Sequence, residues 1–298
     1  ANGLGGGVKF ETAKFKNFQF GVSGYYIYNM GSSDFTVKDP ITNLSNRYEV
    51  GLFDIQNTST TKNMSRLEEL YLKYNYKKSV FTLGKQLINT AFINLQDGRM
   101  RPTEVDGIWV DFNEIKKTTI NVGYIYGISP RSTLQHFKVE QSVGIYPMGL
   151  NPDGTKSDYA GNLQSKGVFI AGVQREMNSH FKLLLWNQYV ENMFNSALVQ
   201  TDFNYAINKG SKLFFGLQAI LQHAVNDGGN ENQAKTYFAK NGASQTFGGN
   251  FGYKDKSIEI SINYNRITAS GRYLMPREWG RDPFYTFMAR ERNEGFGD

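Results

Sequence analysis

The amino-acid sequence predicts an all-β fold, a large antiparallel β-barrel that crosses a membrane. Three observations predict it. Apolar and polar side chains alternate along most of the chain, which is the pattern of strands with two unlike faces. Each alternating segment is about 9 to 13 residues long, and a tilted strand crosses a bilayer in about 9 to 11 residues. The connections alternate between very short and long, as in outer-membrane barrels, where tight turns and long loops lie at opposite ends.

About twelve alternating segments follow one another along the chain. They begin near residues 7, 18, 66, 79, 104, 117, 166, 180, 197, 211, 243 and 257. In the segment 117–127, for example, Val122 and Tyr124 share one face, whereas Asn121 and Gly123 share the other. The alternation is least regular at residues 166–175, so neither face of that strand is assigned.

The connections between these segments support a barrel more strongly than the strands do. Short connections are expected at Lys16 and Asn17, Lys77 and Lys78, 114–116, 177–179, 208–210 and 254–256, and long ones at 30–64, 88–102, 127–165, 224–242 and the tail from 269. Only the link at 193–196 departs from this order. A secreted antiparallel sandwich also alternates apolar and polar residues and stays open as an alternative, but it has no reason to place its short turns at one end.

The two faces of each strand follow from the surroundings of a barrel. Every backbone N–H and C=O group in lipid must be paired within the protein, so a spanning sheet closes on itself and turns apolar side chains outward. Aromatic residues are expected at the two interfaces, here Tyr25, Tyr26, Tyr28, Tyr74, Tyr76, Tyr253 and Tyr264. The inner face is expected to be polar where the lumen holds water. Glycines should occupy its most closely packed positions, here Gly21, Gly84, Gly123, Gly216, Gly248 and Gly252.

Composition excludes several other classes of protein. The longest apolar run near the middle of the chain covers only residues 183–186, whereas a spanning helix needs about 20 residues. The absence of cysteine excludes disulfides, thiol catalysis and cysteine-ligated metals. The formal net charge of +6 favours anionic partners. Because the basic residues are dispersed rather than clustered with aromatic ones, nucleic acid is not expected among these partners.

The sequence predicts no enzyme and no cofactor. Its three histidines, His136, His180 and His223, are far apart and lack the spacing of metal ligands. Glu68 and Glu69 are neighbours on one strand and are expected to point to opposite faces, which is wrong for paired acid and base catalysis. A barrel hydrolase with a site at its rim stays open as an alternative, and it would need a histidine beside a serine or a carboxylate.

Two loop motifs show a resemblance to a known family. The first is Asp97-Gly98-Arg99-Met100-Arg101-Pro102, between two predicted strands, and the second comprises residues 276–284 followed by 290–295. Together they resemble the OprD-type substrate-specific outer-membrane porins, and the likeness runs in order through the chain. Membership implies an eighteen-stranded monomeric barrel in which inward-folded loops narrow the pore and a ladder of basic residues guides carboxylate-bearing solutes. The chain ends after a polar loop, so a single barrel domain over residues 1–298 is expected, with further strands outside this sequence.

Basic side chains beside a narrow, partly dehydrated path would select anions, and arginine suits this task because its planar fork binds carboxylates at two points. Arg99 and Arg101 are the first candidates, with Asp97 on the same loop; local ion pairs with Asp97 or Glu104 are the alternative. The further candidates are Arg277, Arg281, Arg290 and Arg292 on the tail, which acidic neighbours could neutralise, and Lys73, Lys182 and Lys212, which face inward by alternation. The pair Lys77 and Lys78 is interpreted as marking a turn.

The sequence therefore predicts a multi-pass barrel in the outer membrane of a Gram-negative bacterium. Its expected role is the diffusion of small anionic or zwitterionic, amino-acid-like solutes through an arginine-lined constriction. Outer-membrane lipid and lipopolysaccharide are its expected surroundings, and the oligomeric state is open between monomer and trimer. A structural or anchoring barrel with a plugged lumen, part of a larger surface assembly, is the alternative function.

Overall fold

The computed structural model describes residues 1–41, 43, 51–57, 63–95, 101–146, 151 and 155–287. Almost all of its regular structure is strand. The strands are β1 (Gly3–Glu11), β2 (Phe18–Asn29), β3 (Met64–Tyr76), β4 (Ser79–Gln86), β5 (Glu104–Phe112), β6 (Thr118–Ser129), β7 (Phe137–Lys138), β8 (Val168–Glu176), β9 (Phe181–Val190), β10 (Phe194–Asn208), β11 (Ser211–Ala224), β12 (Ala243–Lys254) and β13 (Glu259–Ile267). Two short helices, α2 (Val139–Ser142) and η1 (Gln233–Lys235), lie in the connections, and no helix among the described residues is long and apolar enough to cross a membrane.

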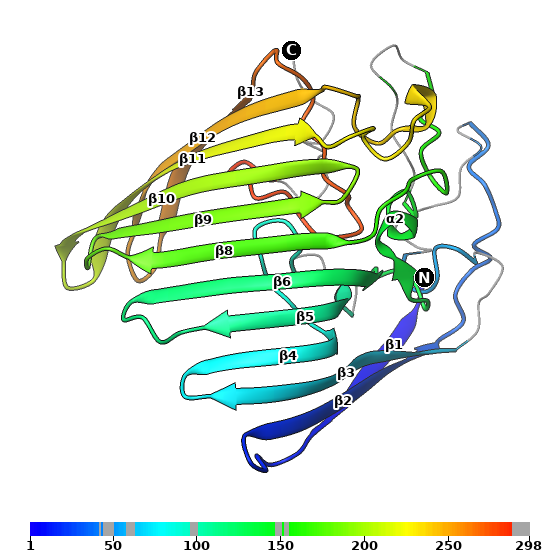
Figure 1. Ribbon diagram of the computed structural model, residues 1–298, viewed down its shortest axis with the longest axis horizontal. Coiled ribbons are helices and arrows are strands. Elements are labelled where there is room, and N and C mark those ends of the chain that lie inside the picture. The colour runs from blue at the N-terminus through cyan, green and yellow to red at the C-terminus, as the bar shows by residue number, and fades with distance from the viewer. Residues whose placement is uncertain are drawn as a thin grey trace.

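The strands form one antiparallel sheet in which almost every neighbour in space is a neighbour in sequence. The order runs from β1 to β13 without a crossover, and the two-residue β7 pairs with β6 beside this path. The sheet is strongly curved, with β1 and β13 turned behind the middle strands (Figure 1). The predicted antiparallel barrel fold is confirmed: the sheet forms the wall of a barrel.

The predicted segregation of the connections is also confirmed. The short connections lie together at the left and bottom of Figure 1, and the long ones lie at the right. The short connections are residues 12–17, 77–78, 113–117, 177–180, 209–210 and 255–258. The link between β9 and β10, residues 191–193, is the short connection at the long-loop end. A meander of long strands with tight turns at one end is the arrangement of outer-membrane barrels.

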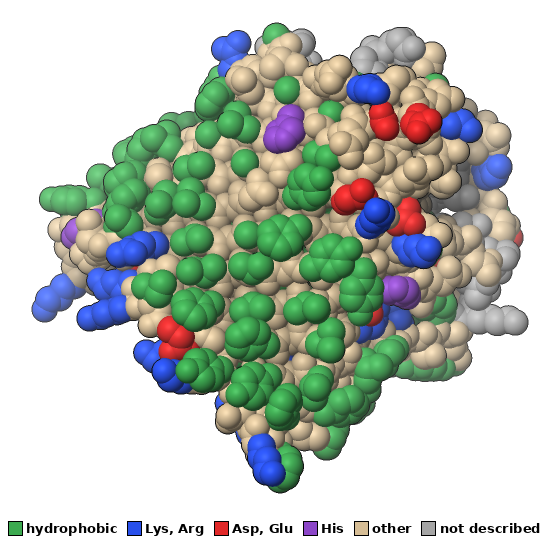
Figure 2. Space-filling model, in the orientation of Figure 1, with side chains coloured by type: hydrophobic (Ala, Val, Ile, Leu, Met, Phe, Trp, Pro, Cys, Tyr) green, Lys and Arg blue, Asp and Glu red, His purple; other side chains and the backbone are tan. Residues whose placement is uncertain are grey.

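The outer face of the sheet is apolar, as the alternation predicts. In β6, Tyr124 and Tyr126 are exposed, whereas Ile125 and Gly127 between and beyond them are buried. Figure 2 shows hydrophobic side chains spread across the viewed face of the sheet. Most of the predicted tyrosines are exposed or half-buried near strand ends, but Tyr25 packs inward against a cluster with Ile27.

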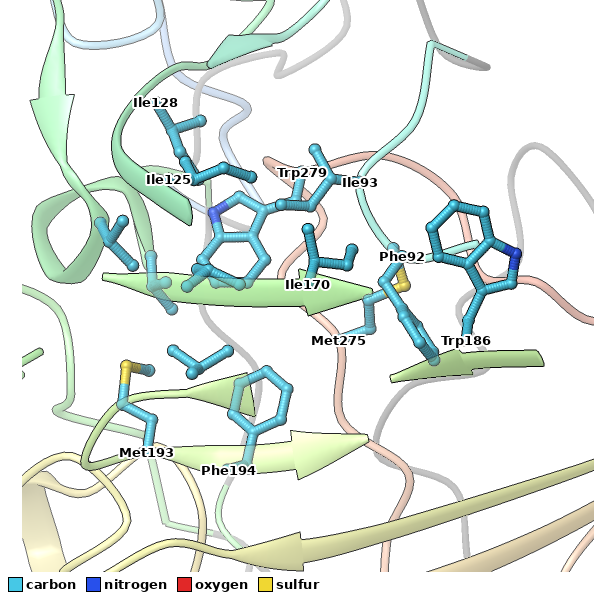
Figure 3. Packing of buried hydrophobic residues seen from close by; sticks show 14 of the residues in the cluster. Phe92, Ile93, Ile125, Ile128, Ile170, Trp186, Met193, Phe194, Met275 and Trp279 are labelled. Carbon is cyan, nitrogen blue, oxygen red and sulfur yellow. The ribbon is translucent and has the colours of Figure 1, made fainter. Parts of the chain in front are cut away.

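The inner face differs from the expectation of a polar wall, because at the long-loop end it is apolar. Ile125 of β6, Ile170 of β8 and Trp186 of β9 point inward and belong to one buried cluster with Trp279, which lies in the connection after β13 (Figure 3). Trp279 is fully buried, and its indole N–H donates to Ser142 Oγ at 2.9 Å. Here the wall covers protein segments that fold inward, so its inner side chains pack against apolar neighbours and not against water.

This packing explains why alternation failed to assign the faces of residues 166–175. Strand β8 buries Val168 and Ile170 on the inside and exposes Phe169 on the outside. Both faces carry large apolar residues because one meets lipid and the other meets the inward segments. Alternation in hydrophobicity is lost wherever a barrel strand is covered on both sides.

Glycines make room for aromatic rings on the inner wall. A Cβ atom added at Gly123 or Gly172 would collide with the indole ring of Trp109 or Trp186 on the neighbouring strand. Tyr71 occupies the corresponding space beside Gly21. The expectation that glycines mark closely packed inner positions is therefore confirmed at these strands.

Candidate functional site

The segment after β13, residues 268–287, lies inside the curve of the sheet and forms the innermost described layer (Figure 1). Side chains of the inner wall hold it. Gln222 of β11 donates to Leu274 O at 2.8 Å and accepts from Leu274 N at 3.0 Å. Gln218 donates to Pro283 O at 2.9 Å, and the Tyr285 hydroxyl donates to Asp202 of β10 at 3.1 Å. Amides and a carboxylate of the wall thus fix the path of this segment across the lumen.

The middle of the segment joins two other inward connections, the one between β4 and β5 and the one between β6 and β8. The Glu278 carboxylate accepts from the N–H groups of Gly144 and Tyr146 at 3.0 and 2.9 Å. Thr103 donates its hydroxyl to Glu278 O at 2.7 Å, and Asn94 donates to Arg281 O and accepts from Arg281 N. Residues distant in sequence therefore form one inner layer, which we call the constriction layer: the described residues of 88–103, 142–146 and 274–287.

Burial governs the ionisation of Glu278. The carboxyl group is desolvated, which raises its pKa, while the three backbone N–H groups around it and the charge of Arg131 oppose that shift. The N–H groups of Gly144 and Tyr146 hold this carboxyl group in place, so Glu278 links the segment after β13 to the residues that follow helix α2.

Arg101 is inside this layer. The side chain is 1% exposed and donates to the carbonyl groups of Arg131 and Phe53 at 3.0 and 2.6 Å. Burial lowers its pKa to about 10, so the guanidinium stays charged at neutral pH. Its described contacts hold loops together, which is a different position from the solute-facing one expected from the sequence.

Arg277 and Arg281 do lie close together. The Arg277 guanidinium is 3.5 Å from the buried Asp282 carboxylate and 5.6 Å from the centre of the Phe287 ring. The Arg281 guanidinium lies 4.9 Å from the same ring centre. Arg131, which sequence reasoning missed, donates to Arg277 O at 2.9 Å and packs against the Tyr146 ring. Arg277 and Arg281 of the constriction layer, together with Arg131 beside it, thus form an arginine cluster.

The three candidate lysines lie on the inner face, nearer the short turns. Lys73 is 2.8 Å from Glu11 and touches the Tyr71 hydroxyl, and Lys212 donates to Asn204 Oδ1 at 2.7 Å. Lys182 lines an open groove of about 370 Å³ at the short-turn end. Lys78, Lys116 and Lys117 line the same groove, together with one carboxylate, that of Glu176.

Four other candidates, Asp97, Arg99, Arg290 and Arg292, lie outside the described residues. Their place on the solute path stays a prediction.

A second charged cluster on the inner wall was missed because of a bulge in β3. Ser23 pairs with Glu69, but the next residue, Gly24, pairs with Leu67, so Glu68 is an extra residue in β3. An extra residue reverses the alternation beyond it, so that Arg66 and Glu68 turn inward along with Glu69. The expectation that Glu68 and Glu69 point to opposite faces is wrong for this reason, since both are buried on the inside.

Arg66 is the centre of this cluster. Its guanidinium pairs with Glu68 through two bonds of 2.7 and 2.6 Å and also donates to the carbonyl groups of Pro102, Pro130 and Thr133. Nearby on the inner face, the Lys85 ammonium of β4 lies 3.6 Å from the Glu104 carboxylate of the neighbouring strand β5. The sequence does carry a signal for this charged cluster, because charged residues alternate at positions 66 and 68. That signal points inward only once the bulge is recognised.

Comparison with known proteins agrees with this architecture. Residues 46–289 match the family described as outer membrane porin, OprD family. Solved structures of similar fold include Pseudomonas aeruginosa OpdK with vanillate, with a TM-score of 0.73 and 14% identity over 99% of this chain and 69% of that one. Acinetobacter baumannii OccAB4 gives a TM-score of 0.70 and 13% identity over 99% of this chain and 68% of that one.

Pseudomonas aeruginosa OccD3 (OpdP) gives a TM-score of 0.70 and 12% identity, over 97% of this chain and 58% of that one. At such identities the likeness to these structures establishes the fold. No curated protein sequence matches the chain at a significant level.

Proposed function

Because the chain belongs to the OprD family of outer membrane porins, we propose that it forms a channel for small anionic or zwitterionic solutes that carry a carboxylate. The protein belongs to the Gram-negative outer membrane, which its wall spans with antiparallel strands. Solutes diffuse through the lumen, and no reaction and no cofactor is part of the proposed mechanism.

The arginine cluster is the observation that carries this proposal. Arg277 and Arg281 lie in the constriction layer with Arg131 beside them, and the carboxylates near them, Glu278 and Asp282, are themselves buried. Positive charge in a narrow, partly dehydrated path lowers the barrier for an anion, because water screens it less there than in bulk. Arg281 is the best placed of the three to meet a solute, since it is half-buried, whereas Arg131 is buried and Arg277 pairs with Asp282.

The inner lysines extend positive charge along the proposed path. Lys182 and Lys212 lie on the inner wall between the constriction layer and the short turns, and Lys182 opens into the groove there. A carboxylate leaving the arginine cluster would meet these ammonium groups next. Lysine ammonium groups are strongly hydrated point charges, which attract an anion without holding it in one geometry.

Competition by an aromatic carboxylate tests the proposal. The solved OpdK structure contains vanillate, so vanillate added to one side of a bilayer is a suitable probe: it should reduce the chloride current of this channel in a concentration-dependent way. Arg281→Gln should weaken the block about tenfold or more, since a hydrogen bond to a charged group is worth about 1.5 to 3 kcal/mol. Lys38→Gln, which removes an exposed positive charge in a long loop, is the matched control.

An equal block of the wild type, Arg281→Gln and Lys38→Gln by vanillate would contradict the role of the arginine cluster. A folded, membrane-inserted protein that conducts no ions would instead support the alternative of a plugged, anchoring barrel.

A further inference from the structure

The short connections of the barrel carry an excess of lysine. Their lysines, here called the lysine rim, are Lys14, Lys16, Lys77, Lys78, Lys116, Lys117, Lys209 and Lys256, and every one of them is exposed. The same connections contain only two carboxylates, Glu114 and Asp255. In Figure 2 lysine and arginine side chains gather at the left margin, where Figure 1 places most of the short turns.

The two carboxylates of these connections serve the turns themselves. Glu114 accepts from Lys78 N and from the Ser79 hydroxyl, each at 2.9 Å, and Asp255 accepts from the N–H groups of Ser257 and Ile258 at 2.7 and 2.9 Å. These backbone hydrogen bonds lower the pKa of both groups. Within the described part of the chain, no rim lysine has a carboxylate at ion-pair distance.

Turn geometry does not explain the lysines. Lys16, Lys77 and Lys117 have φ values of 48°, 49° and 57°, in the left-handed region that glycine and asparagine adopt more easily. A residue chosen only to make these turns would be one of those two. The positive charge is therefore what lysine adds at these positions.

Contacts at two of the turns direct the charge toward the lipid. The Lys16 ammonium lies 5.6 Å from the centre of the Phe15 ring, and the Lys77 ammonium 5.2 Å from that of the Tyr76 ring. Phe15 is 72% exposed and Tyr76 is 46% exposed. Phe15 bridges to Phe18, whose ring packs against Tyr74 on the outer face of the sheet.

Those rings belong to an aromatic girdle next to the short turns. Neighbouring strands stack Phe181 on Phe203 at 4.6 Å and Phe203 beside Phe215 at 6.1 Å. Aromatic girdles of this kind mark the depth at which acyl chains give way to headgroups. The lysine rim begins directly beyond the girdle, so its ammonium groups lie at headgroup depth.

We infer that the lysine rim binds the phosphate groups of anionic phospholipids in the leaflet around the short turns. An anionic phospholipid matches the rim in charge. A headgroup such as that of phosphatidylglycerol carries a net negative charge, and few carboxylates on the rim compete with it for the lysines. The phospholipid also fits in place, because the acyl chains of the same lipid lie along the apolar outer face. Lys78, Lys116 and Lys117 of the rim also line the groove on the proposed solute path, whereas Lys14, Lys16, Lys77, Lys209 and Lys256 do not, so lipid binding by those five does not depend on solute passage.

Lipid retention in nanodiscs tests this inference. The full chain is reconstituted into discs of phosphatidylcholine with a minor fraction of phosphatidylglycerol, and bound lipid is measured by native mass spectrometry. The test variant changes Lys16, Lys77, Lys209 and Lys256 to Gln, since none of the four lines the lumenal groove. Each lysine near an anionic surface strengthens binding about fivefold, so phosphatidylglycerol enrichment should fall at least about tenfold.

The matched control removes the same charge at the opposite end of the barrel, by Lys38, Lys138, Lys156 and Lys166 to Gln, all of them exposed. This control variant should keep the phosphatidylglycerol enrichment of the wild type. A rim variant in which Lys16, Lys77, Lys209 and Lys256 become Arg should keep it too, because the charge is unchanged. An equal loss in both Gln variants, or no loss in the rim variant, would overturn the inference. A heat-dependent gel shift, unchanged in all variants, shows that each is folded.

Discussion

Single residues inside the wall decide how tightly this barrel packs. Two glycines on opposite faces of the sheet differ sharply in their surroundings: a Cβ at Gly172 on the inner face would meet the six-membered ring of Trp186, whereas a Cβ at Gly6 on the outer face would meet nothing within 4 Å. Because the indole is buried between the wall and the inward segments, it has little room to yield.

Gly172→Ala should therefore destabilise the protein by about 1 to 3 kcal/mol, the usual cost of overpacking. Gly6→Ala should leave stability nearly unchanged. Urea unfolding in lipid vesicles, followed by tryptophan fluorescence, measures both. Similar unfolding midpoints for the two variants would show that Gly172 is not needed for the packing of Trp186.

A single residue, Glu278, should also make the docking of the inward connections depend on pH. Burial raises the pKa of Glu278 above its ordinary value of 4.5, so the docked state holds this proton more tightly than an undocked one. The contribution of Glu278 to docking is then most favourable below that ordinary value and is lost as the pH rises through the raised pKa.

Hydrogen exchange at the amides of Gly144 and Tyr146, which donate to Glu278, should therefore be better protected in acidic solution, near the ordinary pKa of a glutamate, than in alkaline solution, after correction for intrinsic rates. Glu278→Gln should abolish that difference. If the variant keeps the wild-type pH dependence, another group controls the docking.

Among the elements, β3 shows what sequence patterns could and could not foretell. The turns, the outward faces and most strand starts followed from alternation and connection length, but β1 begins at Gly3 rather than near residue 7 and β10 at Phe194 rather than near residue 197. The bulge at Glu68 did not, because one extra residue changes no composition and leaves each half of the strand alternating normally. The arginine cluster was partly foreseen: Arg277 and Arg281 were predicted, but Arg131 and the burial of Arg101 depend on contacts between distant connections.

Arg66 connects β3 to two inward connections, and its removal should be costly. Arg66→Ala leaves the Glu68 carboxylate buried without its partner, at a cost of about 3 to 5 kcal/mol. The double variant Arg66→Ala with Glu68→Ala should recover part of that loss. Unfolding free energies of the two variants give the comparison, and a double variant no more stable than the single one would show that the buried charge is not the source of the cost.

On the scale of the whole molecule, the structure combines two kinds of wall. At the long-loop end the sheet encloses a packed layer held by Trp279 and the wall amides, and at the short-turn end it opens into a groove with several lysines. Alternation predicts a wet lumen along the whole length, but the inward connections turn part of it into protein core. The proposed solute path beside the arginine cluster, followed by this groove lined with lysines, is the arrangement expected of a channel that favours anions.

The reversal potential of the unmodified protein in a planar bilayer, with potassium chloride more concentrated on one side, tests this account most directly. Fixed positive charge in the lumen predicts a potential of the sign that chloride permeation produces, decreasing as the total salt concentration rises and screens that charge. A conducting channel whose reversal potential is zero, or has the sign of potassium permeation, would contradict the account.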